Sequence, residues 1–281
     1  MSMSISMLVI FGLLASAAAS VPLKDPPPPP PPPIKAVPQP YIIGGEEAPE
    51  QRYPYLASLG LARNDHTCAA TLIAPDVLLS AAHCQGSFRW ATLGSHKRGE
   101  VFDGTIGAGK RTEEEDDTSV TVRIEKTVPH PRYQYTSANP DIEHDFMLIV
   151  LPEPLDAGQF PPVRLNRNPR TPKKDGELLG IVGWGATTPT NSDLSAVLRH
   201  AFVGYVTPDT CDAADGYISG AYYSYRGFMT SSMMCAWSEE IDACLGDSGG
   251  PLLLRGDEDR NDRDDAYGDV QVGVVSFGVG W

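Results

Sequence analysis

Residues 246–251 read Gly-Asp-Ser-Gly-Gly-Pro, so Ser248 has small neighbours that leave room for a substrate backbone. Glycine also lets the chain direct two consecutive N–H groups at one point. A serine nucleophile and an oxyanion hole require these two properties. The same residues are also consistent with an ordinary glycine- and serine-rich turn before an apolar run. The segment alone therefore does not decide between a catalytic and a structural role.

A nucleophilic serine needs a base within hydrogen-bond reach, and the base needs a carboxylate that orients it. Of the six histidines, only His83 follows an apolar run and precedes a cysteine, whose disulfide would fix the backbone that presents the imidazole. Asp145 leads into the apolar run 146–151, where a carboxylate is costly unless it is paired. A hydrogen bond to an imidazole would satisfy it. The alternatives are a structural histidine at a strand end and a turn aspartate at a strand start.

The elements that would have to position these side chains are short strands. After Tyr41 the chain alternates β-branched and apolar runs with segments rich in Gly, Pro, Asn and Asp, and few segments keep a helical period over ten residues. This pattern predicts an all-β sandwich or barrel. The runs are 77–82, 120–124, 146–151, 178–182, 197–206, 251–254 and 270–277.

The N-terminal 41 residues differ in composition from the rest. Residues 7–14 are apolar and residues 15–20 are small, which predicts a secretory signal peptide (1–20) cut after Ala19 or Ser20. No stretch is long enough to cross a bilayer, so we expect a soluble, secreted protein. Residues 26–33 are all proline and favour an extended polyproline II form. We interpret 21–41 as a proline-rich pro-segment and 42–281 as the folded domain.

The formal charge of −14 argues against nucleic acid or an anionic membrane as partner and favours cationic substrates. Two acidic runs, 113–117 and 257–265, are typical of solvated loops. Calcium is a weak possibility because neither has the spacing of a calcium loop. We expect no other cofactor or metal, and a monomer. Five cysteines in an exported chain imply disulfides with one thiol left over.

Taken together, these segments resemble the trypsin/chymotrypsin-like serine endopeptidases over nearly all of 42–278. The resemblance implies two six-stranded antiparallel β-barrels, about 42–160 and 161–281, with the site in the cleft between them. The matching motifs, in the order of the family, are Ile42-Ile43-Gly44-Gly45, Ala81-Ala82-His83-Cys84, Asp145 before its strand, Gly183-Trp184-Gly185, residues 246–251 and Ser276-Phe277-Gly278.

By this resemblance, Ser248 is the nucleophile, His83 the general base and then acid, and Asp145 the residue that holds the imidazole tautomer. The N–H groups of Gly246 and Ser248 would form the oxyanion hole. Ser276 would help to hold Asp145.

The resemblance also places Asp242, six residues before Ser248, at the base of the primary specificity pocket. A carboxylate there would pair with Arg or Lys of a substrate. Tyr225 and Gly278 would line the pocket, and Gly278 would also pair with an extended substrate backbone. An exposed loop acid is the alternative interpretation of Asp242.

Activation by cleavage before Ile42 is implied as well, because the new α-amine would pair with a buried Asp247. Tyr41, rather than Arg or Lys, precedes the cut, so we expect neither a trypsin-type activator nor self-activation. The disulfides implied by the family are Cys68–Cys84 and Cys211–Cys235.

The family would place a partner for Cys244, the last strand of the second barrel and a C-terminal helix after Gly278. The sequence stops at Trp281, so we expect an incomplete second barrel with an open edge beside the site, and a free Cys244. Two functions remain open. One is a secreted endopeptidase that cleaves protein or peptide substrates after Arg or Lys and that protein inhibitors would bind. The alternative is a protease-like binding protein or decoy.

Overall fold

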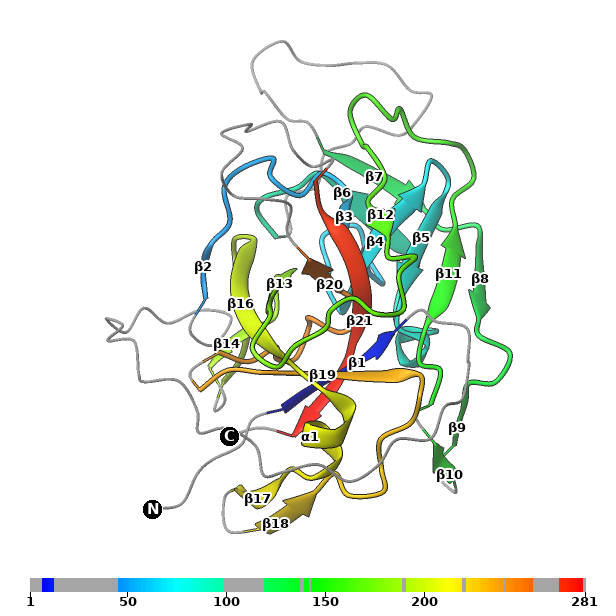
Figure 1. Ribbon diagram of the computed structural model, residues 1–281. Helices are drawn as coiled ribbons and strands as arrows, with labels where there is room; N and C mark the ends of the chain where they lie inside the picture. The colour runs from blue at the N-terminus through cyan, green and yellow to red at the C-terminus, as the bar shows by residue number, and fades with distance from the viewer. Residues whose placement is uncertain are drawn as a thin grey trace.

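The computed structural model describes residues 7–12, 45–98, 119–136, 139–141, 143–188, 191–218, 221–239, 241–254 and 268–279. Several predictions about the sequence therefore lie outside the described residues: the pro-segment 21–41, Ile42, and the acidic runs 113–117 and 257–265. Within these ranges the chain is almost entirely strand (Figure 1). The only helical elements described are the 3-10 turn η1 (Ala82–Cys84) and the short helix α1 (Pro208–Asp212).

The first barrel is a curled antiparallel sheet whose strands follow the order β7-β6-β3-β4-β5-β11-β8. The apolar residues of its strands pack together as the core of this barrel. They include Leu56, Leu59, Leu72, Leu78 and Ile149. The strands are β3 (Leu56–Gly60), β4 (Cys68–Ala74), β5 (Val77–Ser80), β6 (Trp90–Leu93), β7 (Val120–Arg123), β8 (Lys126–Pro129) and β11 (Met147–Val150).

The second barrel is a ring of six antiparallel strands in the order β1-β19-β16-β13-β20-β21, which closes because β21 also pairs with β1. Leu179, Ile181, Val203, Leu252 and Val272 lie in its core. The strands are β1 (Met7–Gly12), β13 (Leu178–Gly183), β16 (Arg199–Val206), β19 (Met233–Trp237), β20 (Pro251–Leu254) and β21 (Val270–Val279).

Five further pieces attach to these barrels. Two short strands add to the ring: β2 (Glu46–Glu47) pairs with β16, and β12 (Arg164–Leu165) pairs in parallel with β21. Three two-stranded ribbons project from the body: β9 (Gln134–Thr136) with β10 (Asn139–Asp141), β14 (Ala186–Thr188) with β15 (Asn191–Leu194), and β17 (Asp215–Ile218) with β18 (Ala221–Ser224). Among the described residues, no helix combines the length and apolar character that crossing a membrane would need.

The two barrels share buried residues where they meet. Trp184, Leu253 and Val274 of the second barrel belong to the same core cluster as the first-barrel strands. Asp269, fully buried before β21, accepts a bidentate pair of hydrogen bonds from Arg52 at 2.6 and 2.8 Å and a third from Tyr55 at 2.5 Å. This network fixes the start of β21 against the first barrel.

The expected open edge in the second barrel is wrong for the described residues. Residues 7–12, which we interpreted as the core of a signal peptide, form β1, and this strand lies between β19 and β21 (Figure 1). The edges of β19 and β21 that face each other are therefore both paired. Among the described residues, β1 completes the ring of the second barrel.

Candidate active site

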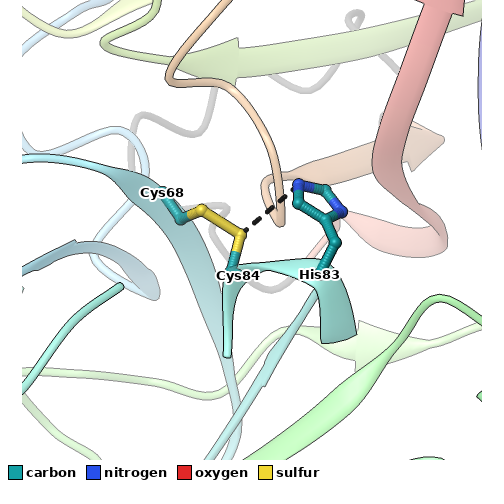
Figure 2. Close-up of side chains that lie close together, drawn as sticks. All are labelled: Cys68, His83 and Cys84. Atoms are coloured by element: carbon teal, nitrogen blue, oxygen red, sulfur yellow. Dashed lines mark hydrogen bonds between the residues drawn. A yellow bond between two sulfur atoms is a disulfide. The ribbon is translucent and has the colours of Figure 1, made fainter. Parts of the chain in front are cut away.

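His83 is presented by η1, the tight turn that follows β5. A disulfide joins Cys84 in this turn to Cys68 at the start of β4, so the backbone on the C-terminal side of His83 is fixed covalently (Figure 2). The three side chains lie close enough together to suggest a metal site. Both sulfurs are consumed in the disulfide, however, and only thiolates bind metals well. We therefore interpret the cluster as a support for the imidazole.

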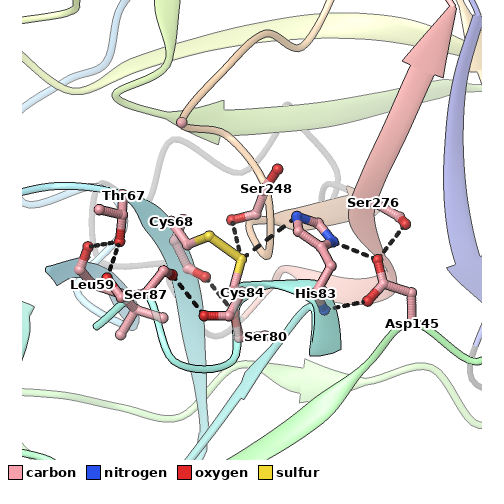
Figure 3. The surroundings of a disulfide bond; sticks show 12 residues. Leu59, Thr67, Cys68, Ser80, His83, Cys84, Ser87, Asp145, Ser248 and Ser276 are labelled. Carbon is pink, nitrogen blue, oxygen red and sulfur yellow. Dashed lines mark hydrogen bonds and ion pairs between the residues drawn. A yellow bond between two sulfur atoms is a disulfide. The ribbon is translucent and has the colours of Figure 1, made fainter. Parts of the chain in front are cut away.

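Asp145 is buried, with 1% of its surface exposed, and each of its oxygens accepts hydrogen bonds. Oδ1 accepts from the backbone N–H of His83 at 2.7 Å, and Oδ2 lies 2.6 Å from His83 Nδ1. Ser276 Oγ on β21 donates to Oδ2 at 2.5 Å (Figure 3). A carboxylate accepts hydrogen bonds, so His83 Nδ1 carries the proton and, in the neutral ring, Nε2 has a free lone pair.

Ser248 lies in the loop between β19 and β20, and main-chain bonds from both barrels hold it. Its carbonyl accepts from Ala69 N on β4 at 2.8 Å, while Gly249 N donates to Val275 O on β21 at 2.8 Å. Gly246 and Gly249 have φ values of +97° and +82°, which glycine adopts without strain. The predicted oxyanion hole, Gly246 and Ser248, therefore sits on a loop whose shape depends on glycine.

Figure 3 shows the Ser248 side chain beside the imidazole of His83. Among the described residues, no hydrogen bond joins the Ser248 hydroxyl to Nε2, and Nε2 lies 3.7 Å from Cys84 Sγ instead. Such contacts are often loose without substrate and tighten when substrate binds. The structure thus brings the hydroxyl, imidazole and carboxylate into one region, with the imidazole–carboxylate half fully formed.

Asp247 is buried beneath the loop, 3% exposed. Its Oδ1 accepts from Gly185 N and its Oδ2 from Cys244 N, both at 2.9 Å. Burial raises the pKa of Asp247 to about 6, although the two backbone hydrogen bonds act in the opposite direction. Gly183 and Gly185 leave the space that the carboxylate occupies, because a Cβ at either position would overlap its oxygens. Ile42 lies outside the described residues, so its predicted pairing with Asp247 stays a prediction.

His66 is a site residue that the sequence did not indicate. Its Nε2 lies 2.9 Å from Gly246 O and its Nδ1 lies 2.7 Å from Ser58 Oγ, and its ring packs edge-on against Trp184. Burial lowers the pKa of His66 to about 4, so the ring is neutral at pH 7. The carbonyl can only accept, so Nε2 carries the proton and donates to it. Its sequence context, Asn-Asp-His, is polar and offered no signal of this role.

Two of the predicted specificity residues lie beside β19 and β21, because Tyr225 packs with Cys235 and Phe277 and Gly278 belongs to β21. Asp242 and Tyr225 are both buried, and Tyr225 packs in a cluster with the Cys211–Cys235 disulfide. Gly278 is exposed near the end of β21. Both disulfides implied by the resemblance are present, and Cys244 is free. Burial raises the pKa of the Cys244 thiol.

Comparison with known proteins gives one consistent family. Residues 42–280 match the family described as Trypsin. Trypsin 5G1 of Aedes aegypti is 29% identical over 242 residues, which cover 85% of this chain and 76% of that protein. Transmembrane protease serine 5 of Homo sapiens is 30% identical over 247 residues, 85% of this chain but only 46% of that protein.

A solved structure agrees with these sequence relatives. Neuropsin, a serine protease expressed in the limbic system of mouse brain, superposes with a TM-score of 0.57 and 27% identity, over 74% of this chain and 80% of its own. The double-barrel fold predicted from the sequence is thereby confirmed. The chain belongs to the trypsin family of serine proteases.

Proposed function

We propose that this protein is a secreted endopeptidase that hydrolyses peptide bonds through Ser248, His83 and Asp145. The observation that carries the proposal is the buried Asp145 carboxylate, which binds both the ring and the backbone N–H of His83. A structural histidine would not need two hydrogen bonds to one buried carboxylate. This arrangement fixes the tautomer that a general base requires, and it leaves Nε2 directed toward the serine loop (Figure 3).

The chemistry follows from this tautomer. Ser248 Oγ attacks the carbonyl carbon of the scissile bond, and its proton passes to His83 Nε2. The oxyanion that forms accepts hydrogen bonds from the N–H groups of Gly246 and Ser248. His83 then gives the proton to the leaving amine as the C–N bond breaks. Water next attacks the acyl carbon while His83 takes its proton, and His83 returns this proton to Ser248 Oγ as the ester C–O bond breaks. Asp145 stabilises the imidazolium and keeps its own charge.

For specificity, we propose cleavage after Arg or Lys, with Asp242 as the partner of the cationic side chain. Support comes from its burial at 5% exposure in a strongly acidic chain. Two disulfides support export to an oxidising compartment. Activation would follow cleavage before Ile42, with Asp247 as the acceptor of the new amine.

A fluorophosphonate that reacts with activated serines tests the catalytic proposal. Chain cut before Ile42 should be labelled at Ser248, and labelling should vanish in Ser248→Ala. Asp145→Asn should reduce kcat by about 10⁴, a size carried over from enzymes of this class. If folded, cut protein is not labelled, the chain is a binding protein or decoy instead.

A peptide library tests the specificity proposal separately. Arg or Lys should precede the cut, and Asp242→Ser should remove this preference. Asp209→Ser serves as the control, since Asp209 is exposed on α1 and its loss changes the net charge equally. A preference for aromatic residues, or an equal effect of the control, would refute the role of Asp242.

A further inference from the structure

Four cationic side chains gather in the segment that connects β12 to β13. Residues 167–174 of this segment read Arg-Asn-Pro-Arg-Thr-Pro-Lys-Lys and contain no acid. No other stretch of eight residues in the sequence holds four cations. The net charge of the chain is −14, to which these eight residues contribute +4, so the remaining residues carry −18. Residues 167–174, which we call the basic connector, are thus opposite in charge to the rest of the protein.

The cations of the basic connector are on the surface, while its backbone is anchored. All four are exposed: Arg167, Arg170, Lys173 and Lys174. Pro172, which lies between them, is buried. The two acids that follow are held by main-chain donors, because Asp175 accepts from Thr207 N at 2.6 Å and Glu177 accepts from Lys173 N at 2.8 Å. The positive charge is therefore presented to solvent.

Two asparagines brace the part of the basic connector that carries the arginines. The Asn166 amide donates to the carbonyls of Asn168 and Thr171 at 3.0 and 2.8 Å, and its Oδ1 accepts from Asn168 N at 2.9 Å. Asn168 Oδ1 in turn accepts from Arg170 N at 3.1 Å. The main chain of Asn166 donates to Gln271 O on β21 at 2.9 Å. This backbone is already ordered, so a ligand would not have to order it on binding.

Exposed cations on an ordered backbone suit a polymer with closely spaced negative groups. Guanidinium and ammonium groups bind sulfate and phosphate oxygens through charge-assisted hydrogen bonds. The eight residues span at most about 28 Å, so the partner must place several anions within that length. They include no aromatic side chain on which a base could stack, and no large apolar side chain that could enter a bilayer. A sulfated polysaccharide needs neither.

The acidic character of the whole chain does not prevent such binding. Exposed charges interact over about 8 Å at physiological ionic strength. A polyanion on the basic connector therefore responds mainly to the charges beside it, and within residues 167–174 these are all positive.

The basic connector begins at the end of β21 that is remote from the candidate site. Leu165, just before it, pairs with Gln271, whereas Ser276 lies five residues further along β21. A strand rises about 3.3 Å per residue, so these two positions on β21 are roughly 17 Å apart. A polymer bound to the basic connector would leave the contact between Ser276 and Asp145 in place.

We propose that the basic connector binds a sulfated polysaccharide and so attaches the protein to a polyanionic extracellular surface. The choice of a polysaccharide rests on the export proposed above. The binding itself does not depend on peptidase activity, because none of its residues belongs to the candidate site.

Fluorescence anisotropy of a labelled heparin decasaccharide tests the proposal on the full chain carrying Ser248→Ala. This chain lacks the nucleophile, so the result is independent of whether the protein is a peptidase. Four contacts, each contributing about 0.7 to the slope of log affinity on log salt, should weaken binding roughly 50-fold between 50 and 200 mM NaCl. An oligothymidylate and an unsulfated hyaluronan, each of matched charge, should bind roughly tenfold or more weakly than heparin at the lower salt concentration. No heparin binding there, or equally tight binding of the oligothymidylate, would overturn the proposal.

A matched pair of variants locates the binding surface. One variant combines Arg167→Gln, Arg170→Gln, Lys173→Gln and Lys174→Gln. The control removes the same charge from exposed cations elsewhere, by Arg89→Gln, Arg123→Gln, Lys126→Gln and Arg226→Gln. The first variant should bind heparin roughly tenfold or more weakly than the parent, and the control should lose less than about threefold. Equal losses would show that net charge, rather than the basic connector, governs binding.

A charge-preserving variant separates charge from local structure. Lys173→Arg with Lys174→Arg keeps both cations, so we expect heparin affinity within about twofold of that of the parent. A loss of roughly tenfold in this variant, with Tm unchanged, would contradict an electrostatic site.

Discussion

The buried carboxylate of Asp247 predicts how the stability of the uncut chain depends on pH. Its pKa is raised by burial from 3.8 to about 6. A raised pKa means that the folded state holds the proton more tightly than the unfolded state. The resulting stability is fully present below pH 3.8 and is lost as the pH rises through about 6. At 1.36 kcal/mol per pKa unit, the difference between the folded and unfolded pKa values of Asp247 corresponds to roughly 3 kcal/mol in the free energy of unfolding.

Asp247→Asn isolates this contribution. The side-chain amide of the variant keeps one carbonyl oxygen, which can accept from Gly185 N or from Cys244 N, while the other N–H faces the amide NH₂. This lost hydrogen bond lowers the free energy of unfolding by about 1–3 kcal/mol, and the loss does not vary with pH. His66 also titrates in this range, because its pKa is lowered to about 4 and its stabilisation is lost as the pH falls from 6.5. That contribution is present in both proteins and cancels when they are compared.

The assay is urea unfolding of the uncut Ser248→Ala chain, with and without Asp247→Asn, from pH 3.5 to 7.5. The free energy of unfolding of the parent, relative to the variant, should fall by roughly 3 kcal/mol as the pH rises from below 3.8 to above 6. A constant difference would show that the carboxylate has an ordinary pKa. After cleavage before Ile42, a buried amine would reverse the trend, because pairing favours the ionised form.

Three further predictions concern the supports of the site. Ser276→Ala removes a hydrogen bond to a charged carboxylate, and we expect kcat/KM to fall roughly tenfold while Tm stays within a few degrees; unchanged kinetics would contradict a positioning role. Gly185→Ala places a Cβ against the Asp247 carboxylate, so we expect a loss of stability of about 2 kcal/mol or more by urea unfolding. Gly158→Ala serves as the control and should lose less, because Gly158 is exposed and a Cβ there would meet only the side chain of exposed Asp156; equal losses would show that the Asp247 carboxylate moves freely. Replacing Cys68 and Cys84 together by serine opens a disulfide that links residues 16 positions apart, and we expect the free energy of unfolding in urea to fall by about 3 kcal/mol. A loss below about 1 kcal/mol would show that η1 is held without the disulfide.

Much of the fold and of the candidate site could be predicted from local patterns. The apolar runs became strands because each contributes to a buried barrel core, and Asp145 is paired because an unpaired carboxylate at that depth would be too costly. The resemblance to the family implied both disulfides and the contact of Ser276 with Asp145, and the structure has all three.

Two features could not be predicted because they depend on contacts distant in sequence. His66 sits in a polar loop, and only the fold reveals that it holds the Gly246 carbonyl across 180 positions. Residues 7–12 carry the same composition as an export signal and as a buried strand, so only the pairing partners distinguish these uses. Local composition specifies that a segment is apolar but not what covers it.

The Arg52–Asp269 pair at the start of β21 joins the two barrels. Moving the barrels apart would separate a buried charge from its partner, at a cost of about 3–5 kcal/mol. Tyr55 donates to the same carboxylate and adds to that cost. The start of β21 is therefore held against the first barrel, and a relative shift of the two barrels at this point is costly.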